Sequence, residues 1–118
     1  MGILRGTSDT IEVKAKAAIS EDLGKVRNLT FKVTFQRRGR EAVQEIIANL
    51  NDSDSDVTVG SILRDDLVGW RELEGEGGEV DYTADNLDAM IDHPEYCKAL
   101  FDAWGSAQMG RTIANTKN

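Results

Sequence analysis

The sequence has very few of the residues that build covalent or metal-bound centres: one cysteine, one histidine and one proline among 118 residues. A single cysteine cannot close an internal disulfide, so nothing here requires an oxidising compartment. His93 and Cys97 lie four residues apart, but two ligands do not complete a zinc site, and a nucleophilic pair needs an orienting third group. We interpret both as packing residues and predict no metal, no cofactor and no catalytic residue.

Long apolar runs and an excess of basic charge are also missing. No apolar run approaches the ~20 residues of a membrane span, and the apolar stretch after Met1 is too short for a secretory signal. The 21 acidic and 14 basic residues give a formal charge of −7. This balance disfavours a nucleic-acid partner, because such proteins usually present a basic face. We predict a cytoplasmic protein with no membrane and no nucleic-acid partner.

Two local patterns resemble ligand sites but lack their essential residues. The stretch 51–56 has aspartates at alternate positions, as a calcium loop does. Val57 and Leu63 occupy the positions where that loop needs glycine and a bidentate glutamate. The glycines of 74–78 have acidic neighbours and no following lysine, so they do not form a phosphate loop. We interpret these segments as a polar linker and an acidic turn.

The N-terminal part has the pattern of a β-hairpin. Residues 10–17 and 29–36 alternate between apolar and polar side chains, the period of half-buried strands. The second segment contains Phe31, Val33 and Phe35, which favour strands. Gly24 lies between the segments and predicts a turn in a long loop. Because an isolated hairpin is marginal in water, we expect its apolar face to cover a helix or another subunit.

Helical periodicity dominates the remainder. Residues 40–50 place apolar side chains at i, i+3, i+4 and i+7, and residues 58–66 predict a second, shorter helix. Thr83 suits the N-cap of a third helix. Pro94 ends that helix and begins a fourth, which runs to about Met109. Between the second and third helices, residues 67–73 and 79–82 predict a small second hairpin around the acidic turn.

The fold class is therefore α+β, with an N-terminal antiparallel hairpin packed on helices and a C-terminal helical half that includes a short second hairpin. We expect one domain over residues 1–118. Its parts are a flexible arm (1–9), the hairpin and first helix (10–50), the polar linker (51–57), a mainly helical part (58–110) and a mobile tail (111–118).

The large aromatic side chains allow two interpretations. Aromatic residues make up only 6% of the chain, so most are needed in the core. Core packing fits Trp104 better than partner contact. Trp70 follows Gly69 on a short segment and fits either role.

The C-terminal half resembles a known family. The features that carry the resemblance are Gly69-Trp70, the acidic glycine turn 76–78, Tyr82-Thr83, Asn86-Leu87 at a helix start, Pro94 before a helix with Phe101 and Trp104, and a closing Lys117-Asn118. This outline, over residues 60–118, is similar to the tail assembly chaperones of long-tailed bacteriophages.

The resemblance implies a non-catalytic protein of the host cytoplasm. Members bind the tape measure protein and help the tail tube protein to polymerise around it. On this basis we expect partner contacts at Trp70, Leu73, Tyr82 and Trp104, and self-association of copies through the hairpin. The alternative is a structural tail protein, a tube or connector subunit, whose N-terminal hairpin joins a sheet between subunits.

Overall fold

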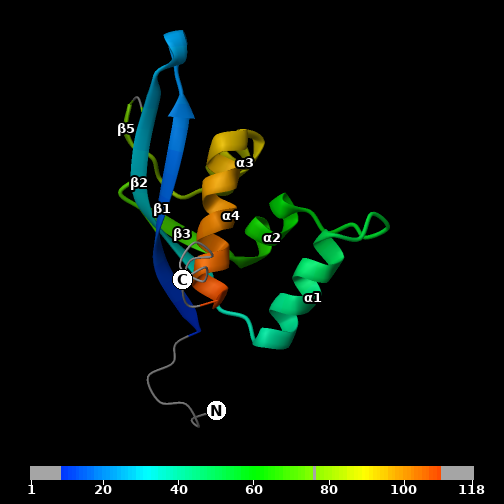
Figure 1. Cartoon of the computed structure of the whole chain (residues 1–118). Helices are drawn as coiled ribbons and strands as arrows, with labels where there is room; N and C mark the ends of the chain where they lie inside the picture. The colour runs from blue at the N-terminus through cyan, green and yellow to red at the C-terminus, as the bar shows by residue number, and fades with distance from the viewer. Residues whose placement is uncertain (1–8, 76, 110–118) are drawn as a thin grey trace, which may run out of the picture.

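The computed structural model describes residues 9–75 and 77–109 and has an antiparallel sheet with helices on one side (Figure 1). Strand β1 (Thr10–Ser20) pairs with β2 (Val26–Gln36) along its whole length, and β2 pairs with β3 (Leu67–Arg71). The strand order is β1-β2-β3. The predicted N-terminal hairpin and the α+β class are confirmed.

The turn of this hairpin is tighter than the long loop that we predicted. The strands extend to Ser20 and Val26, and only a 3₁₀ turn, η1 (Asp22–Gly24), lies within the connection. Ile19 continues the apolar face of β1 and is 8% exposed, which explains the longer strand. Both Leu23 and Gly24 adopt positive φ angles, +63° and +75°, to reverse the chain.

The segment that follows helix α2 (Val59–Asp66) pairs differently from the predicted second hairpin. Residues 67–71 do not pair with 79–82 but add to the sheet as β3, because Leu67 is buried opposite Phe35 and extends the same apolar layer. A β-bulge between Thr34 and Phe35 accommodates the register. The second hairpin is reduced to β4 (Glu74–Gly75) and β5 (Gly78–Glu79).

The four predicted helices are present: α1 (Arg40–Leu50), α2 (Val59–Asp66), α3 (Ala84–Asp92) and α4 (Pro94–Met109). Thr58 caps α2 by accepting a hydrogen bond from the Ser61 backbone, and Thr83 caps α3 in the same way with Asn86. Among the described residues, no helix combines the length and apolar content needed to cross a membrane.

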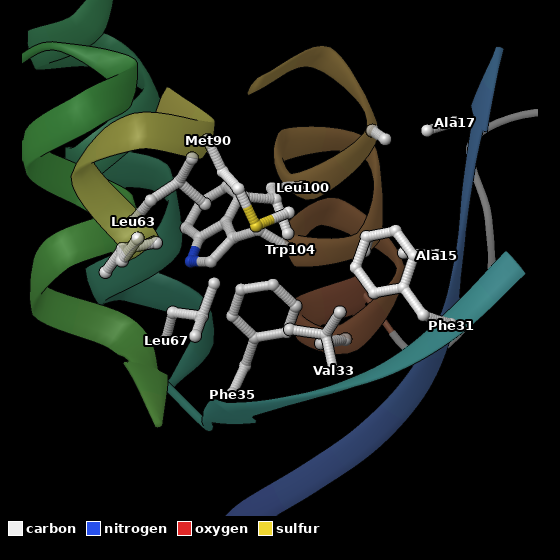
Figure 2. Close-up of a cluster of buried hydrophobic side chains, with 14 of the residues drawn as sticks. Ala15, Ala17, Phe31, Val33, Phe35, Leu63, Leu67, Met90, Leu100 and Trp104 are labelled. Carbon is white, nitrogen blue, oxygen red and sulfur yellow. The ribbon is translucent and has the colours of Figure 1, made fainter. Parts of the chain in front are cut away.

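Helix α4 lies against the inner face of the sheet and forms the core with it (Figure 2). Small residues on the helix, Ala99, Ala103 and Ala107, are buried and allow it to approach the strands closely. The side chains that fill the space between the layers come from β2, α2, β3 and α4, and they include Phe31, Val33, Phe35, Leu63, Leu67, Leu100 and Trp104.

Polar contacts hold both ends of α4 to the sheet. At its start, the Glu95 carboxylate accepts hydrogen bonds from the Ser20 backbone N–H at 3.0 Å and from the Ser20 hydroxyl at 2.7 Å. At its end, the Gln108 side chain donates to the Gln36 carbonyl and accepts from the Arg38 backbone. The helix is therefore fixed across the sheet at two separated points.

Candidate interaction surface

The structure divides the four expected contact residues into two pairs. Trp70 and Tyr82 lie together at the edge of the sheet, whereas Leu73 and Trp104 are 3% and 1% exposed. Leu73 and Trp104 belong to the core, and we correct the expectation that they present a contact surface. Trp104 stacks on Phe101 at a centroid distance of 5.4 Å, and its indole N–H finds a partner inside the protein.

That partner is Asp66, the buried carboxylate at the end of α2. The Trp104 indole donates to one carboxylate oxygen at 2.8 Å, and the Arg38 guanidinium donates to the other, with Nε at 2.9 Å. The hydrogen bond to Asp66 raises the pKa of Arg38 above its ordinary value. Asp66 is only 2% exposed, so its oxygens are already engaged by the protein. This cluster joins α2, α4 and the segment after β2, and its role is structural.

The exposed aromatic edge consists of Val68, Trp70 and Tyr82. The rings of Trp70 and Tyr82 meet edge to face, with centroids 5.0 Å apart and planes at 89°. The Trp70 indole donates to the Val80 carbonyl at 2.8 Å, and the Tyr82 hydroxyl donates to the Leu67 carbonyl at 3.2 Å. Val68 is 47% exposed and Tyr82 is 39% exposed. These bonds fix two rings whose outer surfaces reach solvent.

Sequence reasoning missed a second exposed apolar site at the tip of the β1–β2 hairpin. Leu23 is 93% exposed, and Val26 is also exposed. In Figure 1 this tip extends beyond the helices. A bulky residue with positive φ is uncommon and costs conformational energy. The available signal was a leucine between Asp22 and Gly24, where turns favour polar residues.

A third surface is a groove of about 410 Å³ between α1 and the end of α4. Its lining includes the apolar side chains of Val43 and Ile47 of α1 and Met109 of α4, together with the charged Arg40. The helical periodicity of residues 40–50 identified the apolar face of α1 correctly. The periodicity alone could not show which part of this apolar face the rest of the fold leaves uncovered.

His93 and Cys97 lie at the start of α4, where His93 packs edge to face on Tyr96 with centroids 5.0 Å apart. The His93 Nδ1 is buried and has no hydrogen-bond partner among the residues that the structure describes. Burial raises the pKa of the half-buried Cys97 thiol, which reduces its thiolate fraction at neutral pH. Within residues 9–75 and 77–109, no three histidine, cysteine, aspartate or glutamate side chains gather as metal ligands would.

No protein-family model, curated protein or solved structure matches the chain. A functional interpretation therefore depends on the surfaces of the chain and on the resemblance described above.

Proposed function

We propose that the protein is a non-catalytic phage tail assembly chaperone of the host cytoplasm, which binds the tape measure protein and aids polymerisation of the tail tube protein. The aromatic edge supports this proposal most directly. Two of its residues, Trp70 and Tyr82, lie in the segment that resembles the family; the Tyr82 side chain is exposed and the Trp70 ring is half-buried.

The physical requirements of such a role agree with this surface. A protein that holds a long, aggregation-prone partner needs apolar contacts that do not collapse into its own core. The hydrogen bonds from Trp70 to Val80 and from Tyr82 to Leu67 hold the two rings at the edge. The formal charge of −7 keeps the free protein soluble through self-repulsion.

A pull-down with the tape measure protein tests the proposal. The first variant is Trp70→Ala/Tyr82→Ala, and the second, Val68→Ser/Tyr82→Ser, changes only exposed side chains. Aromatic anchors at the centre of an interface contribute about 2 kcal/mol or more, so we expect recovery to fall about tenfold or more. Leu23→Asn, which removes an exposed apolar side chain at the hairpin tip, is the matched control and should bind normally. Normal recovery by both folded edge variants would refute this role of the aromatic edge.

A structural tail protein is the second candidate, and the open outer edge of β1 favours it. Within residues 9–75 and 77–109 this strand of 11 residues pairs with another strand on one side only, and such an edge can pair with a strand of a neighbouring subunit. Mass spectrometry of purified virions separates the two functions. Many copies per particle would identify a structural subunit, and absence from the particle agrees with the chaperone.

A further inference from the structure

The outer face of the sheet, on the side away from the helices, has a charge opposite to that of the chain. Lys14 and Lys16 of β1, Lys32 of β2 and Arg71 of β3 lie on this face with the two carboxylates Glu12 and Glu72. Four basic and two acidic side chains leave a local excess of positive charge in a protein of formal charge −7. The acidic surplus therefore lies elsewhere on the molecule.

Two of these lysines are not neutralised. Glu12 accepts two hydrogen bonds from Arg71, at 2.7 and 2.9 Å, and Glu72 lies 3.3 Å from the Lys32 ammonium. Lys14 and Lys16 are exposed and form no ion pair within the part of the chain that the structure describes. Moreover, Lys14 is directly opposite Lys32 across the β1–β2 ladder. Like charges in this position destabilise a sheet, so an anion that binds here would relieve a repulsion.

The same segment is the edge strand of the sheet, and none of the other described strands pairs with its outer side. In an antiparallel pair, alternate residues exchange hydrogen bonds with the neighbouring strand. The Arg37 backbone N–H donates to the Asp9 carbonyl, and the Glu21 N–H donates to the Lys25 carbonyl. The backbone N–H and C=O groups of the odd-numbered residues of β1 therefore point toward β2. The Ser20 N–H instead faces outward, where Glu95 binds it. By the same alternation, the N–H and C=O groups of the even-numbered residues between 12 and 18 point away from the sheet.

The charges and backbone groups of this edge favour one kind of binding partner over others. A second copy pairing symmetrically about Lys14, Ala15 or Lys16 would place lysine opposite lysine, which is how natural edge strands resist self-pairing. A nucleic acid could neutralise the lysines, but its sugar–phosphate backbone lacks the amide groups that pair with a strand edge. An extended acidic peptide satisfies both features, because its backbone can pair with the edge while its carboxylates reach the lysines.

We propose that residues 12–18 of β1, together with Lys14, Lys16 and Lys32, bind an extended acidic segment of a protein partner by strand addition. Side chains on one face of a strand repeat every second residue, about 7 Å apart. The segment therefore presents carboxylates at alternate positions, which match Lys14 and Lys16. This inference does not depend on the chaperone role, because it involves a different surface from the aromatic edge.

The test uses the whole chain and a fluorescent octapeptide of alternating threonine and glutamate. An isomer with four threonines followed by four glutamates has the same charge without the alternation. Lys14→Glu/Lys16→Glu reverses the two unpaired charges. Lys25→Glu/Lys98→Glu makes the same change in net charge at exposed positions on the hairpin turn and α4, and serves as the matched control. Amide hydrogen exchange reports on the edge itself.

We expect saturable binding of the alternating peptide that weakens about tenfold in Lys14→Glu/Lys16→Glu and changes by less than about twofold in the control. Bound peptide should slow exchange at the amides of residues 12, 14, 16 and 18 and leave the already paired odd-numbered amides unchanged. Three results would overturn the proposal: no saturable binding by the wild type, equal loss in both variants, or protection absent from the even-numbered amides. Tighter binding of a thymidine octanucleotide at the same lysines would assign the surface to nucleic acid instead.

Discussion

The buried carboxylate of Asp66 permits a quantitative prediction for Arg38→Met. Methionine retains much of the apolar stem of Arg38 but removes the guanidinium that bonds to Asp66. Removing one partner of a buried ion pair costs about 3–5 kcal/mol. The Arg38 side chain is 38% exposed, so water can partly replace it, and the Trp104 indole still binds the second oxygen. We therefore expect a loss of about 2 kcal/mol in the free energy of unfolding.

Urea unfolding followed by tryptophan fluorescence measures this loss. In a Trp70→Phe background the only tryptophan is Trp104, which directly contacts Asp66. With an m-value of about 1.5 kcal/mol/M, the midpoint should fall by about 1.3 M. The control is Arg64→Met, which breaks the exposed pair with Asp88 and should cost less than about 0.5 kcal/mol.

Two outcomes would refute this reasoning. The first is an Arg38→Met midpoint equal to that of Arg64→Met, because the pair with Asp66 would then contribute no more than an exposed one. The second concerns Arg38→Met/Asp66→Asn, in which the buried group no longer has a charge. We expect this double variant to regain part of the lost stability, since an unpaired amide costs less to bury than an unpaired carboxylate. A double variant less stable than Arg38→Met would show that the loss does not come from an uncompensated charge.

Three further predictions concern Leu23 in the β1–β2 turn, the Glu95–Ser20 hydrogen bonds that clamp the start of α4 to the sheet, and the Cys97 thiol. Leu23→Asn should raise the free energy of unfolding by about 0.5–1 kcal/mol, because asparagine tolerates positive φ; a lower urea midpoint would contradict this. The Ser20 hydroxyl and backbone N–H hold the pKa of Glu95 below its ordinary value of 4.5, so this stabilisation is present above that value and is lost as pH falls through the folded-state pKa. Glu95→Gln should therefore make the decline of the urea midpoint below pH 4.5 shallower, and an unchanged decline would argue against the clamp. Cys97 should react with iodoacetamide more slowly than free glutathione at pH 7.5, because burial raises the pKa of its thiol; an equal rate would show a more open site.

Local sequence patterns predicted most elements because the relevant physics is local. Alternation identified β1 and β2, and Thr58, Thr83 and Pro94 marked the helix starts found in the structure. The partner of residues 67–71 was predicted wrongly, because a short extended segment does not encode the strand beside which it lies. The alanines of α4 were overlooked for a related reason. Small residues give a weak periodic signal, yet their size lets the helix approach the sheet.

The surfaces were harder to predict than the fold. Trp70 and Tyr82 were proposed as contacts from the family resemblance, but the same reasoning included Trp104, whose partner Asp66 lies 38 residues away. The repulsion between Lys14 and Lys32 appears only when the strand register is known. Contacts of this kind arise from topology, so composition and spacing alone do not show them.

The position of α1 has a mechanical consequence. This helix lies to one side of the sheet and α4 (Figure 1) and buries only Val43 fully in the shared core. It is joined to β2 through residues 37–39 and to α2 through residues 51–57. Helix α1 can therefore move away on its two connecting segments while the sheet and α4 stay packed together. We therefore expect α1 to detach locally and often, whereas the sheet and α4 separate only in rare unfolding events.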